Sequence, residues 1–93
     1  MWSVFESAAA VKTLTRAPLE IRQKYDLWLS IVQTSGPQGL RLIKGFRDEA
    51  LKGRWQGHRS SRLNLQYRVI YRVVAAEIRV YVVDVTAHDY RRK

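Results

Sequence analysis

The strongest constraint on the fold is a run of strand-like segments in the second half of the chain. Residues Arg59–Leu65, Tyr67–Val74 and Glu77–Val85 are rich in Val, Ile, Tyr and Leu. The gaps between them, at Leu65-Gln66 and Ala75-Ala76, are so short that consecutive strands must form antiparallel hairpins. This half of the chain therefore predicts a small antiparallel sheet of three to four strands.

The first half of the chain predicts a short strand followed by two helices. Trp2–Phe5 is strand-like, Ser7 is placed to cap a helix that runs to Leu14, and Pro18 suits the first position of a second helix. Ser35-Gly36-Pro37 ends that second helix. Its apolar residues form one stripe at helical period, made of Ile21, Tyr25, Trp28, Leu29 and Val32. The expected fold class is α+β, with the N-terminal strand and two helices packed on the sheet.

The connection between the two halves has no clear period. Four glycines interrupt residues 38–57, so we expect a loop-rich segment with a short strand or turn near Leu40–Phe46.

Side-chain alternation orients the predicted strands. In the middle strand it puts Tyr67, Val69, Tyr71 and Val73 on one face and Arg68, Ile70 and Arg72 on the other. In the preceding strand Leu63 and Leu65 point one way, whereas Ser60, Arg62 and Asn64 point the other. The apolar faces should pack on the helices and leave Arg62, Arg68 and Arg72 on an open face. The last strand is apolar on both faces, so alternation does not orient it.

Charge is unevenly distributed along the 93 residues, whose net charge is +9. Residues 1–40 carry a balance of +1 and residues 41–93 a balance of +8, which favours a polyanion or an acidic protein as the partner. The chain has no cysteine, which excludes disulfides and thiolate metal sites. No apolar run approaches membrane-spanning length and no signal-peptide pattern is present. We expect one soluble, cytoplasmic domain spanning residues 1–93, with no membrane association.

Motifs in the last 45 or so residues resemble those of the RelE/ParE superfamily of bacterial toxins. Leu51-Lys52-Gly53, followed by Trp55-x-Gly57 and Tyr67-Arg68-Val-Ile-Tyr71, is similar to the YafQ and StbE-type members. Glu49-x-Leu51-Lys52 and the terminal His88-Asp-Tyr90 are similar to segments of the YoeB-type members. The order of strand, two helices and sheet is also that of the superfamily. Two positions depart from the YafQ type, which has histidine in place of Glu49 and aspartate in place of Gln66.

The resemblance implies a ribosome-dependent mRNA endoribonuclease, the toxin of a type II toxin–antitoxin pair. Members of this branch cleave by attack of a ribose 2′-hydroxyl on the adjacent phosphate, which requires a base, cations and an acid. Carried over by position, Arg68 contacts the scissile phosphate and Arg62 is a second basic group. His88 is the general acid or base, Tyr90 stacks on a base or orients the phosphate, and Glu49 is the other candidate base. The division of roles among Glu49, His88 and Tyr90 remains open.

The remaining basic residues are candidate contacts to phosphates or ribosomal RNA, with a solvated basic surface as the alternative. They are Lys44, Arg47, Lys52, Arg54, Arg59 and Arg72. The implied partners are a cognate antitoxin, the ribosome and mRNA. No cofactor or metal is expected, because His58, His88 and the scattered acids form no ligand set. Two other functions stay open, namely a ParE-like inhibitor of DNA gyrase and a catalytically inactive RNA- or protein-binding module.

Overall fold

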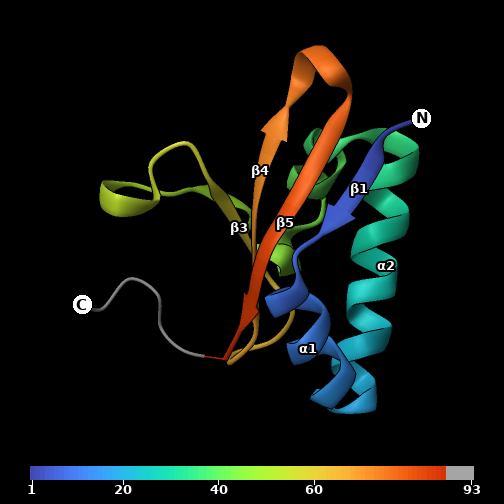
Figure 1. The fold of residues 1–93 in the computed structure, drawn as a ribbon. Coiled ribbons are helices and arrows are strands. Elements are labelled where there is room, and N and C mark those ends of the chain that lie inside the picture. The colour runs from blue at the N-terminus through green and yellow to red at the C-terminus, as the bar shows by residue number, and fades with distance from the viewer. Residues whose placement is uncertain (88–93) are drawn as a thin grey trace.

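The structure, a computed structural model, describes residues 1–87. The strands are β1 (Ser3–Glu6), β2 (Glu49–Ala50), β3 (Arg59–Arg62), β4 (Arg68–Val74) and β5 (Arg79–Thr86), and the α-helices are α1 (Ala8–Arg16) and α2 (Leu19–Ser35). Short 3₁₀ helices span Pro37–Leu42, Lys44–Phe46, Gly53–Trp55 and Ala75–Glu77. Both α-helices lie on one side of the sheet, and the β2–β3 connection projects on the other side (Figure 1).

The α+β class and the hairpins are confirmed, but the sheet is larger than predicted and mixed. Its five strands run in the order β1-β5-β4-β3-β2. The β2–β3, β3–β4 and β4–β5 pairs are antiparallel, whereas β1 pairs in parallel with β5. A parallel pair needs a long connection, and here the whole chain between β1 and β5 provides it. The predicted opening strand thus becomes an edge strand of the sheet.

The helices begin and end near the predicted residues. The Ser7 hydroxyl accepts a hydrogen bond from the Ala10 N–H at 3.0 Å and so caps α1. Pro18 is the residue before α2, one position earlier than predicted, and Gly36 ends α2 with a φ of 80°. The predicted stripe is the buried face of α2, since Ile21, Tyr25, Trp28 and Val32 are buried. In the middle segment, Leu40–Phe46 forms 3₁₀ turns and no strand.

A β-bulge orients the last strand, which alternation left open. The register of β4 with β5 shifts between the pairs Ile70–Asp84 and Tyr71–Val82, so Val83 has no cross-strand partner. The Ser7 hydroxyl donates to the Val83 carbonyl at 2.6 Å, which ties the bulge to the start of α1. Because of the bulge, Val80, Val82 and Val85 all join the core under the helices.

Leu65 corrects a second expectation. It is 82% exposed, and β3 ends at Arg62 instead of continuing to Leu65. The Asn64 carboxamide oxygen accepts hydrogen bonds from the N–H groups of Gln66 and Tyr67, both at 2.7 Å. This local turn closes the hairpin earlier than apolar periodicity indicates, because an Asn side chain competes with the strand ladder for backbone donors.

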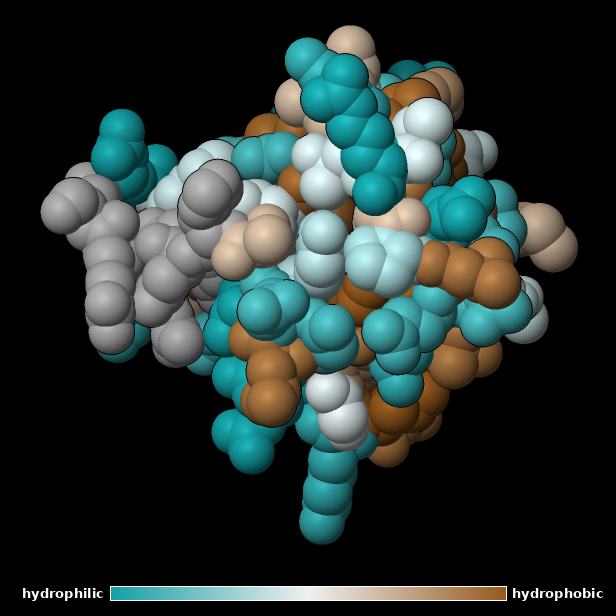
Figure 2. Space-filling view, turned by 90° about the horizontal axis from the view of Figure 1, so that it is seen from below, coloured by the Kyte–Doolittle hydropathy of each residue, from teal (hydrophilic) through white to brown (hydrophobic). Residues whose placement is uncertain are grey.

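Apolar side chains also reach the surface near the start of α2. Val11, Leu19 and Leu27 are 45–60% exposed. Figure 2, which views this end from below, shows hydrophobic residues interspersed with hydrophilic ones at the surface. Among residues 1–87, no helix is long and apolar enough to cross a membrane.

Candidate functional site

The strand register assigns every paired side chain to one of two faces of the sheet. Opposed residues share a face, so Arg62, Arg68 and Thr86 lie together, as do Glu49, Ser60, Ile70 and Asp84. These residues lie on the face opposite α1 and α2, which we call the open face. The predicted placement of Arg62, Arg68 and Arg72 on one face is therefore confirmed.

A pocket of about 290 Å³ lies on the open face at the β2–β3–β4 end of the sheet. It brings together four residues that the sequence singled out, with Asp48 and Ser60 completing the wall. The four are Arg47, Glu49, Arg62 and Arg68. Arg62 and Arg68 are directly opposed across β3 and β4, and Glu49 contributes a carboxylate to the same pocket. Three arginines in one pocket can bind an anionic group through charge-assisted hydrogen bonds.

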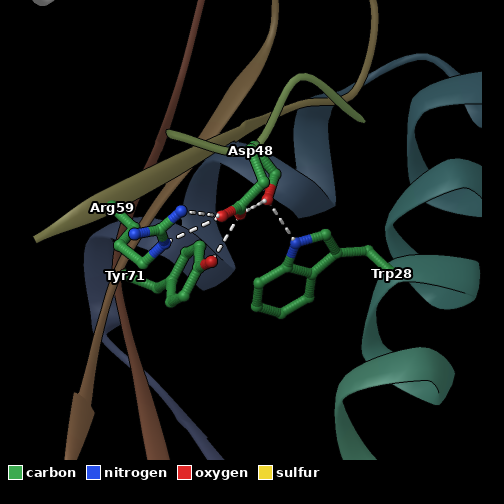
Figure 3. Close-up of polar contacts among 5 residues, drawn as sticks. Trp28, Asp48, Arg59 and Tyr71 are labelled. Carbon is green, nitrogen blue, oxygen red and sulfur yellow. Dashed lines mark hydrogen bonds and ion pairs between the residues drawn. The ribbon is translucent and has the colours of Figure 1, made fainter. Parts of the chain in front are cut away.

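Asp48 is the anchor of this pocket, although its side chain is fully buried. Arg59 donates to one carboxylate oxygen of Asp48 through Nε at 2.8 Å and pairs with it through Nη2 at 2.7 Å. The Ser61 hydroxyl donates to the other oxygen at 2.7 Å, and the Tyr71 hydroxyl donates to that same oxygen. Figure 3 shows Arg59 and Tyr71 converging on Asp48 from β3 and β4, with Trp28 of α2 beside them.

The network extends from Asp48 into the core through Ser61. The indole Nε1 of Trp28 donates to the Ser61 hydroxyl oxygen at 2.9 Å, which links α2 to β3. Trp28 also meets the edge of the Tyr71 ring and stacks on Tyr25, with centroid distances of 5.4 and 5.5 Å. A buried charge is stable only when its hydrogen-bonding capacity is met, and here donors from β3 and β4 meet it while Trp28 of α2 holds the Ser61 hydroxyl in place.

Electrostatic effects in the network agree with this geometry. Burial, reinforced by the hydrogen bond and charge of Asp48, raises the pKa of the Tyr71 hydroxyl. Burial disfavours the charged form of Arg59, but the hydrogen bond and charge of Asp48 outweigh that effect and raise its pKa. On α2, burial and a 2.5 Å hydrogen bond to Glu6 raise the pKa of Tyr25. Tyr71 is thus a neutral donor and Arg59 a charged one.

Anchoring Asp48 fixes its two neighbours in the pocket. Arg47 has a φ of 44°, a left-handed conformation that is uncommon for residues other than glycine. Asp48 points to the helix side of the sheet, whereas Arg47 and Glu49 line the pocket on the open face. The buried carboxylate therefore holds a strained segment in the shape that presents Arg47 and Glu49 to Arg62 and Arg68.

Arg59, one of the candidate RNA contacts, lies apart from the pocket. It opposes Tyr71 across the sheet and so lies on the helix face, as the alternation with inward-facing Leu63 indicates. Its side chain is 22% exposed and forms an ion pair with Asp48. The structure thus gives Arg59 a structural contact, and its phosphate contact stays a prediction.

The other predicted residues lie at several distances from the pocket. Arg72 is exposed on the open face further along β4, and Lys44 is exposed in a 3₁₀ turn. Lys52 and Arg54 are exposed in the projecting β2–β3 connection (Figure 1). His88 and Tyr90 lie outside the described residues.

Asp48 is the residue that sequence reasoning missed. The alternation of side chains along the strand indicates such a residue. Arg59 and Ser61 alternate with Ser60 and Arg62, so Arg59 and Ser61 must face the core. Inward Arg and Ser side chains require a buried partner, and Asp48 and Glu49 are the only acids between Asp26 and Glu77. Within residues 1–87, no group of three or more His, Asp or Glu side chains is arranged to hold a metal ion.

Comparisons with known proteins agree with this architecture. No family model matches the chain, and no curated protein matches its sequence. Solved structures do match over nearly their whole length. A chain of the archaeal RelE–RelB complex from Pyrococcus horikoshii has a TM-score of 0.74 at 21% identity, covering 99% of this chain and 98% of that chain.

Two further solved structures are similar. A chain of the YoeB–YefM complex from Staphylococcus aureus has a TM-score of 0.73 at 18% identity, covering 96% of this chain and 99% of that chain. YafQ from Escherichia coli has a TM-score of 0.70 at 14% identity and covers 92% of both chains. The chain therefore has the fold of the RelE/ParE superfamily of toxins.

Proposed function

We propose that this protein is the toxin of a type II toxin–antitoxin pair and a metal-independent endoribonuclease that cleaves mRNA on the ribosome. The observation that carries the proposal is the pocket in which Arg47, Arg62 and Arg68 converge beside Glu49. Arginine pairs with phosphate through directed, charge-assisted hydrogen bonds. An opposed arginine pair next to a carboxylate supplies both the cations and a base for phosphodiester cleavage without a metal.

The proposed reaction is transesterification within the RNA. A base removes the proton of a ribose 2′-hydroxyl, and the 2′-oxygen forms a bond to the adjacent phosphorus. The bond from phosphorus to the 5′-oxygen of the next nucleotide breaks, and an acid delivers a proton to that leaving oxygen. The products are a 2′,3′-cyclic phosphate and a 5′-hydroxyl.

The side chains take separate roles in this reaction. Arg68 and Arg62 stabilise the negative charge that develops on the phosphate oxygens, and Arg47 adds a third cation to the pocket. Glu49 is the carboxylate base candidate in the pocket. The resemblance supplies His88 and Tyr90 as further proton-transfer and orienting groups, so the proposal assigns proton transfer to these three residues together.

The proposed partner is an antitoxin that covers the basic open face. The similar structures from Staphylococcus aureus and Pyrococcus horikoshii are complexes of YoeB with YefM and of RelE with RelB. With a balance of +8 in residues 41–93, an acidic segment should associate with this face rapidly and in a salt-sensitive way.

The decisive experiment is primer-extension mapping of transcripts after brief expression in cells. We expect cuts inside translated codons and arrested growth for the wild-type chain. Arg68→Ala should abolish most cleavage, because loss of one charge-stabilising donor typically costs about 2.7–4 kcal/mol at the transition state. Arg22→Ala is the matched control, since Arg22 is an exposed arginine on α2.

Two results would contradict the proposal. Early DNA breaks with intact message would favour a ParE-like gyrase inhibitor. A YoeB/ParE toxin from Agrobacterium tumefaciens is also similar in fold, with a TM-score of 0.75 at 18% identity, covering 94% of this chain and 99% of that chain. Intact message and normal growth would favour an inactive binding module.

A further inference from the structure

A row of two aromatic rings and two arginines crosses the open face at the end remote from the pocket. Arg72 on β4, Tyr81 on β5 and Phe5 on β1 are directly opposed in the strand register. The Phe5 and Tyr81 rings stack, with centroids 5.4 Å apart and planes inclined by 21°. Arg79 completes the row, and we call these four residues the aromatic row.

Each ring of the aromatic row carries a guanidinium group. The Arg72 guanidinium carbon lies 4.8 Å from the centroid of Tyr81, and that of Arg79 lies 5.3 Å from the centroid of Phe5. Contacts of this kind are favourable and hold long, flexible arginine side chains in one place. The N–H edges of the two guanidinium groups are thus positioned before any ligand arrives, which lowers the entropic cost of binding.

The aromatic row is accessible. Phe5 is 45% exposed and the Arg79 side chain 47% exposed, and Arg72 is exposed as well. Arg79 lies 3.7 Å from the carboxylate of Glu77, a half-exposed pair that contributes little and is easily exchanged for another anion. Exposed aromatic rings on a sheet face are costly to leave in water, and aromatic rings and guanidinium planes are both surfaces on which nucleobases stack.

The aromatic row lies on the same face as the pocket and in line with it. Arg68 and Arg72 are four residues apart on β4 and on the same face, which places them about 13 Å apart at the usual rise of a strand. A strand of RNA with one phosphate in the pocket can therefore follow β4 and bring its neighbouring nucleotides over Tyr81 and Phe5.

We propose that the aromatic row binds the bases of single-stranded RNA next to the segment held in the pocket, a role that rests on the proposed function and extends it. The rings hold the two guanidinium groups over their faces, so bases can stack on the guanidinium planes and on the exposed ring edges, while the guanidinium N–H groups contact phosphates. An acidic protein segment would use the two arginines but would gain little from the paired rings. The chemistry of the aromatic row therefore favours RNA.

The test is the affinity of the purified full chain for uncleavable, labelled 2′-O-methyl RNA, measured by fluorescence anisotropy with an octamer and a trimer. Phe5→Leu combined with Tyr81→Leu should weaken octamer binding about 5- to 100-fold, the usual range for loss of base stacking. Trimer binding should change less than about twofold, because the trimer fills the pocket alone. Tyr81→Phe keeps the ring and removes only the hydroxyl that accepts from Arg79 Nη1 at 3.4 Å, so it should weaken octamer binding much less than the double leucine variant does.

The arginines give a second readout. Arg72→Gln should reduce the salt dependence of octamer binding. The slope of log affinity against log salt concentration should become shallower by the contribution of about one phosphate contact. Arg22→Gln, the same change on α2, should leave the slope unchanged. Circular dichroism of each variant shows whether the fold is retained. If the double leucine variant is unstable, the Tyr81→Phe and Arg72→Gln variants, which we expect to fold normally, still test the inference.

Three outcomes would overturn the inference. One is a folded double leucine variant that binds the octamer as tightly as the wild type, and another is an Arg72→Gln variant with an unchanged salt slope. The third is a variant of the aromatic row that loses affinity for a polyglutamate peptide but still binds the octamer as tightly as the wild type. That result would assign the aromatic row to an acidic protein. If cells still show codon-linked cuts in these cases, only the inference fails. If the wild type binds neither oligomer and cuts no message, the proposed function fails as well.

Discussion

Replacing Asp48 by alanine tests whether the buried carboxylate holds the pocket and the core together. The change removes the acceptor of Arg59, Ser61 and Tyr71 and leaves a mostly buried guanidinium without its counterion. Breaking a buried pair by removing one partner typically costs about 3–5 kcal/mol, because the remaining charge stays desolvated. A domain of this size has a total stability of about 5–15 kcal/mol, so the loss is a large share of it.

Urea unfolding followed by tryptophan fluorescence measures this loss, since Trp28 belongs to the network through Ser61. We expect the unfolding free energy of Asp48→Ala to fall by about 3–5 kcal/mol. In thermal unfolding the midpoint should fall by at least about 12 °C, at about 4–8 °C per kcal/mol for a domain of this length. Asp26→Ala is the control, because Asp26 is exposed on α2 and its loss should stay within about 0.5 kcal/mol.

A double variant separates the ion pair from mere loss of packing. If Asp48 acts mainly on Arg59, adding Arg59→Met to Asp48→Ala should cost less than the sum of the single changes, because the unpaired buried charge is then gone. The reasoning is refuted if Asp48→Ala loses less than about 1 kcal/mol, or if the two changes are additive.

Three other predictions follow from particular residues. The pKa values of Tyr71 and Tyr25 are raised in the folded protein, so their contribution to stability is complete below the unfolded pKa near 10 and is lost as the pH rises above it. The free energy of urea unfolding should therefore be lower at pH 11 than at pH 8, and Tyr71→Phe should make this difference smaller. A difference that Tyr71→Phe leaves unchanged would contradict the raised pKa of Tyr71. Gly36→Ala should lower the free energy of unfolding by more than about 1 kcal/mol, because φ is +80° at this position and an added Cβ would meet Trp2 Nε1 at 2.7 Å. Gly45→Ala is the control in the same urea assay; its Cβ would enter open space, so the change should be near neutral. In single-turnover cleavage on programmed ribosomes, Glu49→Gln and His88→Ala should each slow the reaction about 10²–10⁴-fold if they are the base and the acid; a wild-type rate for His88→Ala would exclude it from proton transfer.

Much of this fold is readable from local patterns, because those patterns depend on one element at a time. The 3.6-residue period identified the buried face of α2, and alternation put Arg62 and Arg68 on one face, as the register confirms. The parallel pairing of β1 with β5 is not readable in this way. It joins residues at the two ends of the chain, and nothing in Ser3–Glu6 specifies a partner about 75 residues away.

Local patterns failed at Leu65, and they left the orientation of the last strand and the burial of the open face undetermined. Asn64 ends β3 before Leu65 by accepting two backbone N–H groups, and the bulge at Val83 resets the faces of β5. Ile70 shares the open face with the arginines, yet it is fully buried, so that face is not uniformly solvated. Each of these effects depends on partners that are distant in sequence or on a single side-chain hydrogen bond.

The candidate site shows why charge counts alone misassign residues in a basic domain. Arg59 and Arg62 are three positions apart on one strand, and this odd spacing sends them to opposite faces of the sheet. Arg59 meets Asp48 and stabilises the fold, whereas Arg62 reaches the pocket with Arg68. Asp48 and Glu49 divide in the same way, one inward and one into the pocket. The alternation of side chains along each strand therefore separates charged residues that stabilise the fold from those that are candidates for function. This distinction needs no comparison with a related protein.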